Sequence, residues 1–147
     1  MLALLLPAAV EARKPRCTLR VHLEGNVHDG NVFSSQIPSP TTGKKVVIQK
    51  TPTISERDVV AFAPYQAADG SYGALFILDD HGKLALDTLS VERRGTYLYV
   101  FVNGRGVAEL QIDRRVSDGK LYVASGLTQE DLALMKKDWR VIGGSNR

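Results

Sequence analysis

Alternation of hydrophobic and polar residues predicts most of the strands in this chain. Leu19, Val21 and Leu23 alternate with polar residues over 18–24, which is the two-residue period of a half-buried strand. Apolar runs between turn-forming residues predict further strands at 46–49, 72–78, 97–102, 107–116 and 120–124. The pattern therefore favours a strand-rich domain.

Two dipeptides separate the last three predicted strands. Asn103-Gly104 and Asp118-Gly119 supply residues that tolerate the positive φ of tight hairpin turns. We therefore expect these strands to form a twisted antiparallel sheet with hairpins at both dipeptides.

Two segments in the middle of the chain are expected to be helical. Ser55 is a good N-cap, and the acidic residues after it suit the first turn of a short helix that ends near Phe62, before Pro64. The segment 81–95 also looks helical, with Gly95 placed to stop it. Its apolar candidates are Leu84, Leu86, Leu89 and Val91.

The best-defined helix is expected near the C-terminus. Thr128 as N-cap and Asp131 three residues later form an acidic variant of the capping box, and Leu127 and Leu132 are spaced as a hydrophobic staple. We expect the helix to end at Gly143-Gly144. Its buried face would carry Leu132, Met135 and Trp139. The expected class is therefore α+β, with the sheet packed against two or three helices.

The first twelve residues differ from the rest. The apolar run LALLLPAAV is too short to span a bilayer as a helix, but it suits the core of a secretory signal peptide. Val10 and Ala12 supply small residues for cleavage after Ala12, although no basic residue precedes the run. We expect a periplasmic or secreted protein that does not span the membrane after cleavage. A buried N-terminal segment is the alternative.

A length of 147 residues suits one domain. The segment 25–45 is rich in Gly, Asn, Ser, Pro and Thr, which predicts a loop. The expected organisation is a signal peptide, an N-terminal strand with this loop, an α+β domain and a flexible tail, at 1–12, 13–50, 51–141 and 142–147.

Charge gives little support for a nucleic-acid partner. The chain has 19 basic and 16 acidic residues, a formal charge of +3. The basic residues occur in scattered pairs among acids, which is typical of a solvated mixed-charge surface.

Side chains with chemical potential are few and scattered. Cys17 is the lone cysteine, so it cannot form an internal disulfide. His22 lies on the polar face of a strand and His28 in the loop, so their side chains need not converge on a metal. His81 follows Asp79-Asp80, and a capped helix start explains these adjacent residues better than a ligand set. We therefore predict no catalytic, cofactor-binding or metal-binding residue, and no cofactor.

The order of elements resembles a known family. From Thr51 to Lys137, the chain resembles the head region of the first extracytoplasmic (periplasmic) domain of SecD, a protein-export membrane protein. The matching features, in order, are an acidic capped turn, a strand ending in Asp79, a helix stopped by Ser90 to Gly95, the run Asn103-Gly104-Arg105-Gly106-Val107, the Gly119 turn, Ser125-Gly126, and a helix opened by Leu127-Thr128-Gln129-Glu130-Asp131.

The resemblance implies a head-like α+β fold in an extracytoplasmic setting. It does not extend to the transmembrane helices of SecD, and it brings no catalytic residues with it. The leading hypothesis is a small exported soluble bacterial protein of the cell envelope that binds a protein or peptide without catalysis, along a free sheet edge or an exposed apolar face. Two alternatives remain, namely a structural or oligomeric envelope component and an enzyme that uses carboxylates such as Asp79, Asp80, Asp113 and Asp118 near His81.

Overall fold

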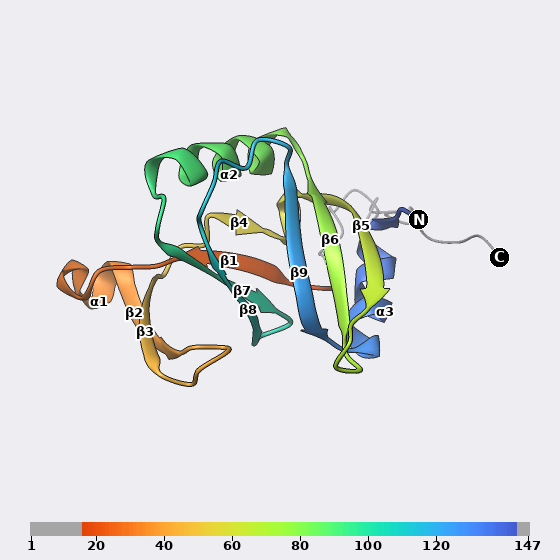
Figure 1. Ribbon diagram of the computed structural model, residues 1–147, viewed down its shortest axis with the longest axis horizontal. Coiled ribbons are helices and arrows are strands. Elements are labelled where there is room, and N and C mark those ends of the chain that lie inside the picture. The colour runs from red at the N-terminus through yellow and green to blue at the C-terminus, as the bar shows by residue number, and fades with distance from the viewer. Residues whose placement is uncertain (1–15, 144–147) are drawn as a thin grey trace, which may run out of the picture.

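The computed structural model describes residues 16–143 and has an α+β fold, as expected (Figure 1). The expected signal peptide, 1–12, and most of the expected tail lie outside the described residues. The strands are β1 (Leu19–Leu23), β2 (Ser34–Pro38), β3 (Lys45–Gln49), β4 (Ile54–Ser55), β5 (Val59–Gln66), β6 (Tyr72–Leu78), β7 (Tyr97–Val102), β8 (Arg105–Gln111), β9 (Lys120–Leu127) and β10 (Arg140–Val141). The helices are α1 (Gly30–Phe33), α2 (Asp80–Glu92) and α3 (Gln129–Asp138), with short 3-10 turns at Val27–Asp29 and Glu56–Asp58.

The strands form two four-stranded sheets and a separate two-stranded ribbon. Sheet 1 has the order β4-β1-β7-β8, sheet 2 has the order β10-β5-β6-β9, and the ribbon pairs β2 with β3. All pairs are antiparallel except β10 with β5. Because β1 lies between β4 and β7, residues 19–23 belong to the same folded unit as the expected 51–141 domain.

One apolar core joins the two sheets and the two longer helices. On the inner face of sheet 2, Trp139 packs edge-on against Phe62 and Phe76, with ring centroids 6.1 and 5.9 Å apart. Met135, one turn earlier on α3, is fully buried. Helix α2 lies across the top of the view in Figure 1 and buries Leu86 and Leu89. Leu84 and Val91, also expected on its apolar face, are exposed instead.

The chain enters the fold beside α3. The carboxylate of Asp138 accepts hydrogen bonds from the backbone N–H groups of Arg16 and Cys17, at 2.6 and 2.7 Å. Cys17 is fully buried two residues before β1, and burial raises the pKa of its thiol to about 12.

Two local predictions are confirmed. Asn103 and Gly104 form the tight turn between β7 and β8, with φ values of 50° and 84°. The hydroxyl of Thr128 accepts a hydrogen bond from the N–H of Asp131, and the Asp131 carboxylate accepts one from the N–H of Thr128, which is the predicted capping box. Helix α3 ends before Trp139, earlier than expected, because the chain then extends to pair with β5.

The hairpin expected at Asp118-Gly119 does not join paired strands. Strand β8 ends at Gln111, and β9 pairs with β6 rather than with β8. The intervening chain is bound to α2, because the N–H of Val116 donates to the Ser90 hydroxyl and Arg115 pairs with Asp87. The connection therefore runs along α2 from sheet 1 to sheet 2, and the turn at Asp118-Gly119 leads into β9, a strand of the other sheet.

The helix expected over 55–62 is wrong beyond its first turn. Ser55 forms a capping box with Asp58, but only Glu56–Asp58 is helical. The following Val59-Val60 is better suited to a strand, and β5 pairs with β6 along its length. The backbone carbonyl of Phe62 faces β10 and accepts from the N–H of Ile142. The backbone of Pro64, two residues later, faces the same side, beyond the end of β10, so its missing N–H costs no ladder hydrogen bond.

The loop expected over 25–45 also contains regular structure. Its 34–38 segment is β2, which pairs with β3 from Ser34–Gln49 to Pro38–Lys45. Its polar composition hides the strand, and Pro38 is accommodated at the strand end. No helix within residues 16–143 is long and apolar enough to cross a membrane.

Candidate polypeptide-binding groove

Strands β8 and β9 are the facing edges of the two sheets. Each is the edge strand of its sheet, and no strand within the described residues pairs with the free edge of either one. They touch where Val107 meets Gly126, because a Cβ on Gly126 would lie 3.2 Å from the Val107 carbonyl oxygen. The two edges therefore converge at this end without forming a ladder.

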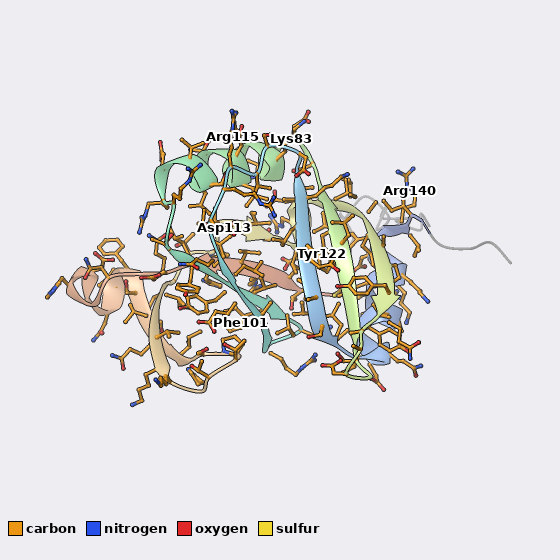
Figure 2. The ribbon with its side chains drawn as sticks, in the orientation of Figure 1. Lys83, Phe101, Asp113, Arg115, Tyr122 and Arg140 are labelled. Carbon is orange, nitrogen blue, oxygen red and sulfur yellow. The ribbon has the colours of Figure 1, made fainter. Side chains whose placement is uncertain are left out.

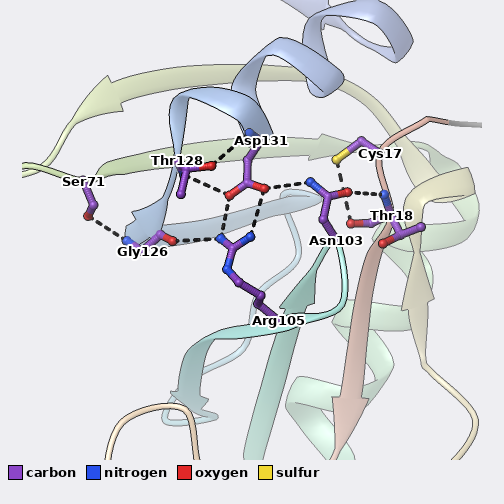
Figure 3. A network of polar contacts seen from close by, with 8 residues as sticks. All are labelled: Cys17, Thr18, Ser71, Asn103, Arg105, Gly126, Thr128 and Asp131. Carbon is purple, nitrogen blue, oxygen red and sulfur yellow. Dashed lines mark hydrogen bonds and ion pairs between the residues drawn. The ribbon is translucent and has the colours of Figure 1, made fainter.

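A polar network fastens the point of convergence (Figure 3). Arg105, at the start of β8, donates to both carboxylate oxygens of Asp131, at 2.6 and 3.2 Å, and to the carbonyl of Gly126 at 3.3 Å. Asn103 donates to Asp131 and accepts from the N–H of Thr18, which ties the end of sheet 1 to α3.

Asp131 is ionised although it is only 2% exposed. Burial disfavours its charge, but the hydrogen bonds from Arg105, Thr128 and Asn103 outweigh burial and lower the pKa of Asp131 to about 2. The network therefore carries a stable ion pair that fixes the relative position of β8, β9 and α3.

Away from this network, β8 and β9 separate around an apolar groove of about 280 Å³. Its walls come from α2, from both sheets and from the connection between β8 and β9. The apolar lining consists of Leu86, Leu98, Leu110, Ile112, Val116, Leu121 and the ring of Tyr122. Asp113, Arg114 and Lys120 stand among the polar lining residues, so the groove has an apolar interior and a charged margin.

The groove continues onto the outer face of sheet 2. A second hollow, of about 440 Å³, shares Arg114, Val116, Lys120 and Tyr122 with the first and adds Leu75, Arg115, Ser117 and Asp118. Figure 2 shows Tyr122 on β9, below Lys83 and Arg115 at the top of the molecule. The two hollows form one continuous surface, which we call the β8–β9 groove.

Tyr122 is an exposed aromatic side chain held in place. It is 55% exposed and stacks on Tyr65, with ring centroids 5.5 Å apart and an angle of 12° between the rings. The hydroxyl of Tyr65 donates to the carbonyls of Val123 and Ala124, at 3.0 and 2.9 Å, and its ring lies over Gly73. This stack gives the groove a rigid aromatic rim.

The backbone of β9 is open beside this rim. The N–H of Leu78 donates to the carbonyl of Gly119, so Gly119 faces β6. In an antiparallel ladder successive residues alternate in direction, so the peptide groups of Lys120 and Tyr122 face away from β6. The N–H of Lys120 donates to the Asp118 carboxylate, so the groups open on this side within the described residues are the Lys120 carbonyl and the N–H and carbonyl of Tyr122. An extended chain could hydrogen-bond there while placing an apolar side chain in the groove.

Of the histidines and aspartates singled out from the sequence, Asp113 and Asp118 line the β8–β9 groove, whereas His22, His28, His81, Asp79 and Asp80 are not among its lining residues. His22 bonds to the carbonyl of Gln49 at 2.7 Å, and His28 lies exposed in the 27–29 turn. Asp79 caps α2 through the N–H of Gly82, and the carboxylate of Asp118 accepts from the N–H of Lys120.

The structure does bring one unexpected residue to His81. Asp58 lies 2.8 Å from its ring, and this contact raises the pKa of His81. One ligand atom each from Asp58, Asp79 and His81 lie within 4.8 Å of one another. Both carboxylates already bind backbone N–H groups, Asp58 that of Ser55 and Asp79 that of Gly82, so the arrangement is a reinforced helix start.

Sequence reasoning missed the groove because its parts are far apart along the chain. In the sequence Tyr122 is one residue of the strand predicted at 120–124, and no local signal pairs Arg105 with Asp131 or Ser90 with Val116. Asp131 carried a signal for its capping role alone.

No protein-family model and no curated protein matches this chain. Among solved structures, it is similar to one described as a membrane component SecDF that enhances protein export, with a TM-score of 0.56 and 11% identity over 86% of this chain and 64% of that chain. It is also similar to SecDF in a super-membrane-facing form, with a TM-score of 0.57 and 12% identity over 86% of this chain and 19% of that one. The chain thus spans less than two thirds of either structure. At the level of fold the resemblance to the SecD head is confirmed, and this chain has a SecD-head-like α+β fold.

Proposed function

We propose that this protein binds extended polypeptide segments in the β8–β9 groove, as an exported bacterial module of the cell envelope. The observation that carries the proposal is the pair of open strand edges that diverge around an apolar groove. Open edges offer backbone hydrogen bonds to any sequence, and a shared apolar groove selects segments with large apolar side chains. No chemical step is required of the protein.

In this proposal the bound segment adds a strand beside β9. Its backbone pairs with the carbonyl of Lys120 and with the N–H and carbonyl of Tyr122, and one apolar side chain enters the space between Leu110 and Leu121. The ring of Tyr122 covers that side chain from the outer face.

The export setting is part of the proposal. It is supported by the signal-like residues 1–12 and by the fold shared with SecDF, which is described as enhancing protein export. Within this setting the folded unit that includes 51–141 is the binding domain.

The test is the affinity of a permanently unfolded, carboxymethylated protein for the purified chain, measured by calorimetry. Replacing Tyr122 by Ser should weaken binding about tenfold, because it removes an aromatic side chain from the rim of the site. Leu84→Ser is the matched control, since Leu84 is 66% exposed on α2 and lines neither part of the groove. Absence of binding to the wild type, or equal loss in both variants, would contradict the proposal.

A structural or oligomeric role is the second candidate, because the same open edges could pair with another copy of this chain. Light scattering separates the two candidates. A concentration-dependent dimer that Tyr122→Ser dissociates would favour assembly over capture of foreign polypeptide.

A further inference from the structure

The β2–β3 ribbon forms an arch over the outer face of sheet 1. At its base, the N–H of Gly25 donates to the carbonyl of Val47, and Glu24 bridges to Ile48. At its far end, the hydroxyls of Ser39 and Thr41 both donate to the carboxylate of Glu109 on β8. The ribbon is thus attached at both ends, and Figure 1 shows it beside β7 and β8, away from sheet 2.

The attachment is close at the far end. Pro40 lies against Gly106, where a Cβ would come within 2.9 Å of the proline ring. Gly106 pairs with Phe101, and Phe101 pairs with Arg20, so these three residues form one row on the face beneath the arch. Figure 2 labels Phe101 on this part of the molecule.

A cavity of about 260 Å³ remains beneath the arch. Its lining consists of Thr18, Arg20, His22, Ile37, Ile48, Phe101 and Gly104. Ile37 and Ile48 come from the ribbon and Phe101 from β7, so the cavity has apolar walls on both sides. Thr18, Arg20 and His22 are alternate residues of the chain entering and forming β1, so they share one face.

The polar groups of this cavity differ in how they are used. The Nδ1 of His22 donates to the carbonyl of Gln49, and its ring packs edge-on against Phe101 with the ring centroids 5.5 Å apart. The side chain of His22 is therefore held in place as part of the cavity lining. The side chain of Arg20 makes no hydrogen bond within residues 16–143, and its one ion pair there is a long contact of 3.9 Å from Nε to Glu56. Glu56 accepts instead from the N–H of Leu19. Arg20 is therefore a cation with unused donors beside an apolar wall.

We propose that this arch cavity binds the C-terminal residue of a polypeptide whose last side chain is apolar. The α-carboxylate pairs with the guanidinium of Arg20, which is shaped for two parallel hydrogen bonds to a carboxylate. The attached apolar side chain packs on Phe101, Ile37 and Ile48. Within a polypeptide, only the C-terminal residue carries a free α-carboxylate beside an apolar side chain, and the cavity of about 260 Å³ lies below the range of about 300–1,000 Å³ typical of drug-sized ligands.

This site is separate from the β8–β9 groove, and its test does not depend on that groove. The probe is a short fluorescein-labelled Gly/Ser peptide that ends in Phe, prepared with a free C-terminus and as the C-terminal amide. Fluorescence anisotropy should show the acid binding about tenfold tighter than the amide, because the amide loses a charge-assisted pair.

Arg20→Gln should abolish this preference for the acid. Arg94→Gln, which makes the same charge change at an exposed residue outside the cavity, should preserve it. Circular dichroism melting checks that both variants are folded. The proposal is overturned if neither peptide binds, if acid and amide bind equally, or if the preference survives in Arg20→Gln. Competition by N-acetyl-phenylalanine as strong as by the peptide would assign the cavity to small carboxylates and also overturn it.

Discussion

Arg105 and Asp131, which lie on different structural layers, form a bidentate ion pair with Nη2 to Oδ2 at 2.6 Å. The pair joins the first residue of β8 to the first turn of α3, at the point where the two sheets converge (Figure 3). Its strength determines how firmly the closed end of the β8–β9 groove is held.

Removing the charge of Asp131 should destabilise the fold. We expect Asp131→Asn to lower the free energy of unfolding by about 2 to 3 kcal/mol, because it leaves Arg105 without its carboxylate partner. Urea denaturation measures the change. Asp113→Asn is the control, since Asp113 is exposed and its substitution should fall within about 0.5 kcal/mol of the wild type.

The same carboxylate makes stability depend on acid pH. Because the pKa of Asp131 is lowered from 3.8 to about 2 in the folded state, its contribution is fully present above pH 3.8 and disappears as the pH falls through about 2. The shift corresponds to about 2 kcal/mol at neutral pH. Stability curves of wild type and Asp131→Asn should therefore converge over this window, and a constant difference down to pH 2 would contradict the assignment.

A methyl group at position 73 should disrupt the rim of the groove. A Cβ there would lie 2.3 Å from the Tyr65 hydroxyl and 2.5 Å from the Ala124 carbonyl. Gly73→Ala should therefore destabilise the protein by about 1 to 3 kcal/mol through overpacking. Shortening the tyrosine in Tyr65→Ala/Gly73→Ala should restore only part of the loss, because the Ala124 carbonyl belongs to the backbone and remains in place. Full restoration would mean that the contact with the Ala124 carbonyl does not contribute to the loss of stability.

Two leucines of α2 provide a matched pair for its packing. Leu89 is buried, whereas Leu84 is 66% exposed. Leu89→Ala should cost about 2 to 5 kcal/mol and Leu84→Ala less than about 0.5 kcal/mol in thermal or urea unfolding. Equal effects would mean that α2 presents a different face to the core.

The Asp58–His81 contact should be visible in a titration. Since the hydrogen bond that the His81 ring donates to the Asp58 carboxylate raises the pKa of His81, Asp58→Asn should lower that pKa, as followed by the ring proton shifts in NMR. The charged pair stabilises the fold below pH 6.5, and this contribution is lost as the pH rises through the raised pKa. Asp80→Asn, beside His81 in sequence, should have the smaller effect because Asp80 does not contact the ring.

Local signals predicted the parts of this fold that depend on neighbouring residues. Asn103-Gly104 needs only its own φ values to make a hairpin, and Thr128 needs only Asp131 to begin a helix. The α+β class followed from such elements.

The errors lie where distant residues decide the outcome. Nothing near Asp118-Gly119 reveals that Ser90 and Asp87 hold the preceding chain on α2, so the partner of β9 was not predictable. The residues of Val59–Gln66 do not indicate that this segment pairs with β6, and the capping box at Ser55 suggested a longer helix. The candidate groove was hidden for the same reason, since its walls come from α2, β8 and β9.

The burial of Cys17 makes its thiol a natural reporter of partial opening. A thiol whose pKa is about 12 and that has no solvent contact reacts with alkylating reagents only in molecules where the entering chain has left Asp138. Because it is the lone cysteine, every modified molecule marks that event, and the rate of modification measures how often the N-terminal edge of the domain comes loose.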